Sequence, residues 1–448
     1  MDNVVDVLPH PHQAETQGFA VRRALPIFFA ALVCAATMWN TVDINFYGDN
    51  ESIALDWPVV LKLILAAFCT MAGLFGVLFD ARIRGTLLFG PGLLLSLLAI
   101  VFVTTSVVAL PEVANVCRAA ALLYVGYLLF IPTALSVLGL RTIIIACLCG
   151  MIVNLLACWG LFLFFPELGV FQEQLGNEVM SSRMGGLGHP NAIGRIAVLT
   201  GLLGLAILRS RQLCPKWPGG RALLVGVMVL GLVSALATFS RTAIVAGVIA
   251  IVFLMLDRIS TREGMTLVLA AFFCVVVGLL GFELVSGGGG LADSLLSATT
   301  KTGEIEELTS ATGRTAIWAE SIRLIFERPV TGWGLNSAPV LLEDFSRHTH
   351  NLVLHATFSG GFLAGLLVVC LLAWNFFFGL GSEEPLVRAV SMYVLVSGLF
   401  EDTVLDTFAS PSTILWLLVL LHPAMVALSK QEPIESDAET AYTEAVPT

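Results

Sequence analysis

The sequence predicts an all-α fold: a polytopic helical membrane protein of about twelve transmembrane helices, with one large loop between the ninth and the tenth. The chain is 57% hydrophobic and 12% charged, and its mean hydropathy is +0.89. Apolar runs recur along most of its 448 residues. Such runs cross the hydrocarbon core of a bilayer, about 30 Å thick, as helices that rise about 1.5 Å per residue. A soluble fold could not bury this much apolar surface.

The apolar runs place the predicted helices along the chain. An N-terminal tail (1–23) precedes nine spans (24–285), a long loop with an amphipathic helix (286–350) follows, and three spans (351–428) lead to an acidic tail (429–448). The expected spans are 24–40, 57–79, 86–109, 113–135, 141–165, 191–208, 222–238, 242–256, 265–285, 351–378, 387–400 and 411–428.

The distribution of basic residues orients these helices. Lysine and arginine accumulate in alternate loops, and the positive-inside rule assigns those loops to the cytoplasm. Both termini are therefore expected in the cytoplasm, and the loop 286–350 on the outer side. The turn Ser240-Arg241-Thr242 departs from the rule, because it puts an arginine outside. The basic loops hold Arg22, Arg23, Arg82, Arg84, Arg141, Arg209, Arg211, Lys216, Arg221, Arg258, Arg262, Arg388 and Lys430.

Reactive side chains concentrate in one stretch, residues 313–362. This charged, aromatic segment interrupts a chain that is otherwise almost entirely apolar helix, which indicates that it holds the chemistry. Its arginines and histidines are Arg314, Arg323, Arg328, Arg347, His348, His350 and His355.

Four short segments are predicted to face outward together. They are 183–191 (RMGGLGHPN), 240–242 (SRT), 313–318 (GRTAIW) and 350–351 (HN). In this order and spacing they resemble the O-antigen ligase and polymerase superfamily of bacterial inner-membrane proteins. The resemblance extends over about residues 180–365 and includes the RP-x2-GWG turn after the GR-x3-W block.

The resemblance implies an enzyme of the bacterial inner membrane with a periplasmic active site. Such enzymes transfer a glycan from a polyprenyl-diphosphate-linked donor to an acceptor hydroxyl. The family's essential histidine, which precedes an asparagine at the head of a span, corresponds to His350. Its two arginines correspond to Arg241 and Arg314, so the resemblance implies these three residues as the catalytic set.

These residue types suit that reaction. The leaving diphosphate gains negative charge as the anomeric C–O bond breaks, and arginine binds phosphate oxygens bidentately without losing its own charge. The attacking hydroxyl needs a proton acceptor, and histidine serves that role near neutral pH. Direct attack by the hydroxyl predicts inversion at the anomeric carbon.

Substrate-binding residues are expected around this set. Arg183, His189 and Asn191 form one outer edge, and Asn351 follows the catalytic histidine. Trp333 is open to two interpretations: it stacks on a sugar ring, or it anchors the chain at the membrane interface.

Several neighbouring groups are expected to be structural. His348 is interpreted as a loop residue, and His355 as a core histidine of the tenth span. Arg323 and Arg328 lie on a predicted amphipathic helix, 315–327, whose apolar stripe is Ile317, Trp318, Ile322, Ile325 and Phe326. Glu401 and Asp402 are interpreted as solvated acids, and Lys62, Arg118 and Arg195 as span-end charges.

Neither a cofactor nor a metal is expected. All cysteines except Cys214 lie in apolar runs, none has metal-ligand spacing with histidine, and no Asp-x-Asp motif is predicted on the outer side. The chain has no Walker loop, dinucleotide fingerprint or basic nucleic-acid stripe. Arginine rather than Mg²⁺ is therefore expected to stabilise the leaving group.

Two choices stay open at the sequence level. Within the superfamily, a polymerase joins glycan repeat units, whereas a ligase attaches finished glycan to lipid A-core; the TGRT-x-IW wording of 312–318 favours a polymerase. Membrane lipids, a chain-length regulator and a flippase are the expected partners. The alternative from another class is a twelve-helix transporter or lipid-linked oligosaccharide flippase, but neither two-half self-similarity nor midplane charges support it.

Overall fold

The computed structural model describes residues 11–39, 57–175, 179–255, 314–343, 345–346, 348–402, 404–405 and 410–429. This part of the chain is almost entirely helical, which confirms the all-α polytopic fold class. Seven of its helices are long and apolar enough to cross a membrane. Three shorter apolar helices accompany them: Ala24–Trp39, Arg241–Met255 and Pro385–Ser397.

The described helices match the predicted spans closely. Every expected span except 265–285 coincides with a helix, and 265–285 lies outside the described residues. In chain order the helices are α1 (Pro11–Trp39), α2 (Trp57–Phe79), α3 (Ala81–Leu88), α4 (Gly90–Val107), α5 (Ala114–Phe164), α6 (Pro166–Gly169), α7 (Pro190–Arg209), α8 (Pro218–Thr238), α9 (Arg241–Met255), α13 (Arg314–Glu327), α14 (Ala338–Leu341), α15 (Leu352–Trp374), η3 (Asn375–Gly379), α16 (Pro385–Ser397) and α17 (Pro411–Ser429).

Helix α5 joins two predicted spans, 113–135 and 141–165, in one 51-residue element. The connection is a bend at Gly139, whose φ of 69° lies in the left-handed region that favours glycine. The expected loop at Arg141 is therefore only a kink. The two predicted spans are thus two helices that meet at Gly139.

A two-stranded hairpin, which the sequence did not predict, precedes α7. Strands β1 (Val170–Leu175) and β2 (Val179–Met184) pair antiparallel, with Phe171 opposite Arg183. Gly186 then turns the chain with a φ of 78°, so close to α5 that a Cβ would lie 3.0 Å from Cys158 Cα. The hairpin thus fixes the approach of the 183–191 segment to α7.

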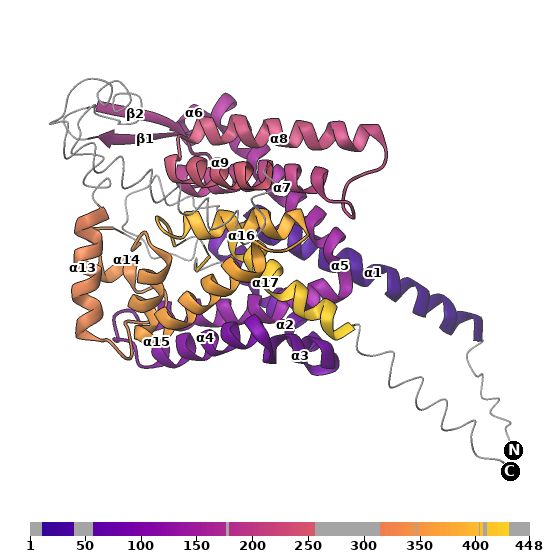
Figure 1. Cartoon of the computed structure of the whole chain (residues 1–448), viewed down its shortest axis with the longest axis horizontal. Coiled ribbons are helices and arrows are strands. Elements are labelled where there is room, and N and C mark those ends of the chain that lie inside the picture. Colours follow the sequence, from indigo (N-terminus) through magenta and orange to yellow (C-terminus); the bar gives the residue numbers. More distant parts are fainter. Residues whose placement is uncertain are drawn as a thin grey trace, which may run out of the picture.

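The helices pack as a bundle (Figure 1). α1 and α2 pack on α5, α15 packs on α4, and α7 packs on α8, α9 and α16. α17 is central: Ile414 through Leu421 are all buried.

α13 lies across one end of the bundle, roughly perpendicular to the spans (left of Figure 1), and packs on α15. This confirms an amphipathic helix in the predicted place, but the predicted stripe was partly wrong. The buried face is Ile317, Ser321, Leu324 and Ile325, whereas Ile322 and Phe326 are exposed. A spacing of i, i+4, i+7 and i+8 is the one that puts side chains on a single helical face.

Candidate functional site

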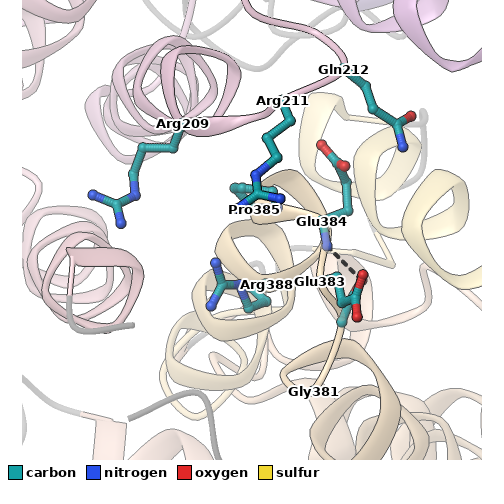
Figure 2. Close-up of a pocket in the computed structure, with 9 residues that line it drawn as sticks. Arg209, Arg211, Gln212, Gly381, Glu383, Glu384, Pro385 and Arg388 are labelled. Carbon is teal, nitrogen blue, oxygen red and sulfur yellow. Dashed lines mark hydrogen bonds between the residues drawn. The ribbon is translucent and has the colours of Figure 1, made fainter. Parts of the chain in front are cut away.

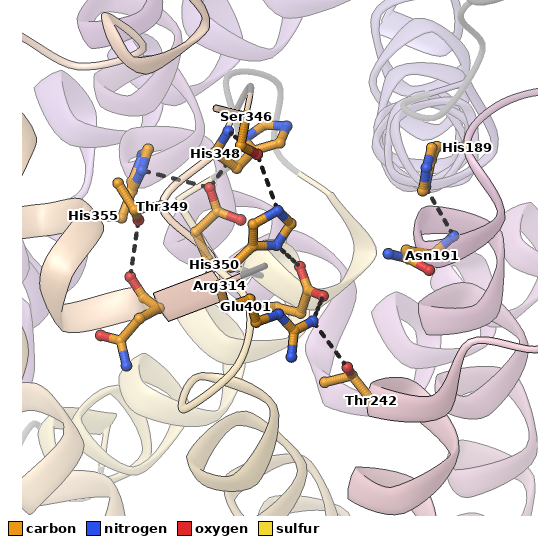
Figure 3. A network of polar contacts seen from close by, with 12 residues as sticks. His189, Asn191, Thr242, Arg314, Ser346, His348, Thr349, His350, His355 and Glu401 are labelled. Atoms are coloured by element: carbon orange, nitrogen blue, oxygen red, sulfur yellow. Dashed lines mark hydrogen bonds and ion pairs between the residues drawn. The ribbon is translucent and has the colours of Figure 1, made fainter. Parts of the chain in front are cut away.

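Three distant parts of the chain meet at the α13 end of the bundle (Figure 3). Arg314 is the first residue of α13, His350 directly precedes the N-cap of α15, and Glu401 follows α16. Thr242, in the first turn of α9, completes the group. The sequence predicted that Arg314 and His350 would come together. It did not predict that Glu401 would join them.

Glu401 links the arginine to the histidine. Its Oε1 accepts a hydrogen bond from Arg314 Nη2 at 2.9 Å, and its Oε2 lies 3.2 Å from His350 Nδ1. Arg314 Nη2 also donates to Thr242 Oγ1 at 3.3 Å. A carboxylate only accepts hydrogen bonds, so His350 Nδ1 carries a proton in this pairing and Nε2 is the acceptor of the neutral ring.

His350 is held in an uncommon conformation. Its φ of 51° lies in the left-handed region, which costs free energy for a residue with a Cβ. Its Nε2 lies 3.1 Å from Ser346 Oγ, so the hydroxyl donates to the ring nitrogen that Glu401 leaves available. The imidazole is thus fixed from both sides before any substrate arrives.

Asn351 explains how this backbone is held. Its Oδ1 accepts a hydrogen bond from Leu354 N at 2.9 Å, which caps α15. Its Nδ2 donates to Leu399 O at 3.0 Å, which ties the start of α15 to the end of α16. The predicted binding residue Asn351 therefore positions His350 against Glu401, with both side-chain polar atoms engaged in the fold.

A second set of histidines gathers around Asp402. Asp402 Oδ2 lies 3.1 Å from His348 Nδ1 and 3.5 Å from His355 Nδ1. The prediction that Glu401 and Asp402 are solvated was wrong: they are only 8% and 4% exposed. The segment after α16 turns both carboxylates into the bundle, where they contact Arg314 and the histidines.

The surrounding charges keep both carboxyl groups ionised. Burial acts to raise the pKa of Glu401, but the hydrogen bond from His350 and the charges of Arg195 and Arg314 outweigh it, so the pKa lies below its usual value. Burial likewise opposes ionisation of Asp402, yet His348, with smaller contributions from His355 and Arg195, holds its pKa well below the usual value.

Arg195 is a further residue that the sequence interpretation missed. It follows Asn191 by one turn of α7 and lines a small cavity with Tyr393 and Glu401. Its charge acts on both Glu401 and Asp402. The i, i+4 spacing from Asn191 was the available signal, since it puts Arg195 on the α7 face that carries the HPN motif.

The predicted edge formed by Arg183, His189 and Asn191 is assembled, beside the His350 group rather than within it (Figure 3). Arg183 is buried and donates through Nε to Thr238 O at 2.9 Å and through Nη2 to Asn191 Oδ1 at 3.0 Å. His189 Nδ1 accepts from Asn191 N at 3.1 Å and caps α7. This edge joins the hairpin, α7 and α8.

Arg241 is brought to the same end of the bundle. It is the first residue of α9, half-buried, and is followed by the Thr242 that contacts Arg314. Phe239, with a φ of 49°, makes the sharp turn between α8 and α9. The two predicted arginines therefore start two neighbouring elements, 73 positions apart in sequence numbering, as Arg241 and Arg314.

Trp333 lies elsewhere. It is 7% exposed, packs with Leu324 and Phe358, and donates through Nε1 to Leu324 O at 2.9 Å. The guanidinium of Arg328 covers its ring at 4.5 Å from the centroid. The ring is thus enclosed by protein. It is the indole of Trp318 that reaches the histidine segment, donating to Thr349 O at 2.9 Å.

The remaining predicted residues have plain structural environments. Arg323 pairs with Glu320 at 2.6 Å and also with Glu327, as expected for an exposed helix surface. Arg347 lies outside the described residues.

Comparison with known proteins agrees with the geometry. The sequence model of a family described as O-antigen ligase matches residues 226–369. This range contains Arg241, Arg314 and His350, but not Glu401 or the 183–191 segment. No curated protein matches the sequence. The match confirms the resemblance to the O-antigen ligase superfamily, and with it a multi-pass membrane protein of lipid-linked glycan chemistry.

Proposed function

We propose that this chain, a member of the O-antigen ligase superfamily, is a polysaccharide polymerase of the bacterial inner membrane. It would transfer a growing glycan from a polyprenyl-diphosphate carrier to a hydroxyl of the next lipid-linked repeat unit, on the periplasmic side. The observation that carries this proposal is the linked set Arg314–Glu401–His350, which joins an anion-binding group to a proton acceptor.

In this proposal His350 acts as the general base. Glu401 holds the Nδ1–H, so Nε2 can accept the proton of the acceptor hydroxyl. The acceptor would take the place of the Ser346 hydroxyl, which occupies Nε2 in the free protein. As the acceptor oxygen bonds to the anomeric carbon, the bond from that carbon to the diphosphate oxygen breaks, and the configuration inverts.

Arg241 and Arg314 would receive the departing diphosphate. Arg314 uses only Nη2 in the described contacts, and a guanidinium has five N–H donors, so most of its fork is available to phosphate oxygens. Preorganised cations of this kind stabilise charge that develops in the transition state. In this proposal the two arginines therefore stabilise the leaving diphosphate without a metal ion.

A reconstitution assay tests the reaction and the choice of acceptor. Purified protein is given a lipid-linked repeat unit, with or without lipid A-core, in the presence of a chelator. The proposal expects longer lipid-linked glycan without lipid A-core, an inverted linkage by NMR, and no loss of activity on chelation. Product formed only with lipid A-core would identify a ligase instead, and chelator sensitivity would assign the leaving-group charge to a metal.

The sidedness of the proposal has its own test. Single cysteines at Lys216, in the loop between α7 and α8, and at Glu343, just before the histidine segment, are placed in a cysteine-free background. An impermeant thiol reagent added to intact spheroplasts should label position 343 and spare position 216. Labelling of 216 alone would put the active site on the cytoplasmic face. The flippase and chain-length regulator remain partners to be sought by co-purification.

A further inference from the structure

Two cavities of different character meet the last turn of α7. A polar one, about 590 Å³ in volume, lies between this turn and the segment Gly381–Pro385 that leads into α16, and arginines and glutamates line it (Figure 2). The other, about 280 Å³, lies between α5, α7 and α8. Its described lining is apolar apart from one charged residue, Arg141. This apolar groove is the one that points to a ligand.

The packing of the helices leaves the groove open. α5 and α8 both pack on α7 but hardly on each other. The buried side chains of Ile207 and Leu224 form the floor, whereas the rim is exposed: Ile145 is 48% exposed, Trp217 62% and Leu223 66%. Because α5, α7 and α8 are all long and apolar enough to cross a membrane, an open groove between them faces the hydrocarbon of the bilayer.

The length of the groove matches one leaflet of a bilayer. On α5 its lining extends from Arg141 to Ile152, about 16 Å at the rise of an α-helix. On α8 it extends from Trp217 to Val227, about 15 Å. The hydrocarbon of one leaflet is about 15 Å thick, half of the whole core. The groove therefore has the length of a single acyl chain.

Positive groups gather at one end of the groove. Arg141 is exposed, and no hydrogen bond or ion pair joins it to another residue of the described structure. Gly220, in the first turn of α8, lines the same cavity, and the N-terminus of this helix has no side-chain cap, which favours a negative group there. The exposed Lys216 directly precedes Trp217, a residue type typical of the headgroup level. This end of the groove therefore suits an anion at the membrane surface.

We propose that the groove binds one acyl chain of an anionic phospholipid, whose phosphate lies on Arg141 and the N-terminus of α8. Phosphatidylglycerol has the required net negative charge, whereas the choline of phosphatidylcholine cancels it. The described lining has no acidic side chain that would pair with a cationic headgroup. α8 extends for 21 residues, about 30 Å, from this cavity to the turn before Arg241. The site is thus separate from the His350 group, and the inference does not rest on the proposed reaction.

Photo-crosslinking tests this inference. Purified protein in a neutral detergent is illuminated with phosphatidylglycerol that carries a diazirine on one acyl chain, and the attachment sites are mapped by peptide mass spectrometry. Attachment is expected within 144–152 of α5 and 223–227 of α8. Unlabelled phosphatidylglycerol should compete for these sites about tenfold more effectively than phosphatidylcholine, as expected for one charge-assisted contact. Arg141→Gln should weaken capture at these sites about tenfold.

Arg211→Gln provides the matched control. Arg211 is also exposed and lies at the same end, but it lines the polar cavity and not the groove. This variant should leave capture at the groove unchanged. Equal competition by the two lipids, or an equal loss in Arg141→Gln and Arg211→Gln, would overturn the inference. Competition by inorganic phosphate as strong as that by phosphatidylglycerol would also overturn it, because the acyl chain would then contribute nothing to binding.

Discussion

The two ends of this bundle arrange their charged side chains differently. At the α13 end, the buried Glu401 contacts the half-buried Arg314 and His350, and these three groups are partners within the protein. At the α7–α16 end, Arg209, Arg211 and Arg388 gather around an open cavity, with the acids on the far wall. Mutual pairing fixes side-chain geometry, as a reacting site requires. At the cavity, arginines from α7, from the loop after it and from α16 instead lie around one shared polar space.

The largest expected effect is at the α13 end, where we propose that His350 acts as the base. His350→Ala should lower glycan transfer by about 10²–10⁴-fold, the usual range for a general base. His350→Asn is the matched variant, since asparagine tolerates the left-handed backbone at φ 51°. Initial rates at equal membrane abundance are the measurement.

His348→Ala and His355→Ala should be milder, because those rings face Asp402. Activity retained in His350→Asn and lost in His348→Ala would move the base to the other histidine set.

The next effect tests the pairing itself. Arg314→Lys keeps a charge but loses the planar fork, and should reduce transfer about a hundredfold; Arg241→Lys is expected to behave similarly. Because Arg314 and Glu401 are 2.9 Å apart, Arg314→Gln combined with Glu401→Gln should be far from additive. A double-mutant cycle on kcat/KM measures the coupling.

Arg221→Lys, an exposed arginine at the opposite end, should transfer glycan at the native rate. Strict additivity of the Arg314 and Glu401 variants would mean that the two residues act separately, and the contrast between the ends would then fail.

The third effect concerns stability. The pKa values of Glu401 and Asp402 are lower in the folded protein than in the unfolded chain, where they are about 4.3 and 3.9. The two ionised carboxylates therefore contribute their full free energy of stabilisation above those unfolded pKa values. That contribution is lost as the pH falls through the lower folded pKa values. The native protein should therefore lose thermal stability as pH falls below about 4. Glu401→Gln with Asp402→Asn should flatten this decline.

Thermal unfolding in detergent, followed from pH 7 down into the acid range, is the measurement. The exposed Glu112, at the same end of the bundle, supplies the control Glu112→Gln, which should keep the native pH dependence. A double variant as acid-sensitive as the native protein would show that these buried carboxylates do not couple to folding.

The sequence predicted those features that depend on residues within a single helix or motif. Apolar runs located the spans, and short motifs located His350 and Arg314, since each signal lies within one element. The pairing of Arg314 with Glu401 joins residues 87 positions apart, and no local pattern contains it. For the same reason the sequence did not predict that Arg195 lines a cavity with Glu401, or that Trp333 is buried in a hydrophobic cluster. The β1–β2 hairpin was missed because its strands are short and lie between two spans.

The hydrogen bond from Ser346 to His350 Nε2 has a consequence for fidelity. A base next to an activated sugar diphosphate would deprotonate water as readily as an acceptor, and the carrier lipid would lose its glycan to hydrolysis. In the proposed mechanism, the Ser346 hydroxyl would keep Nε2 occupied until an acceptor alcohol displaces it. Ser346→Gly should therefore release free glycan from the donor in the absence of acceptor, while the native protein releases little. Ser346 would thus suppress hydrolysis of the donor by His350 and leave transfer to the acceptor as the main reaction.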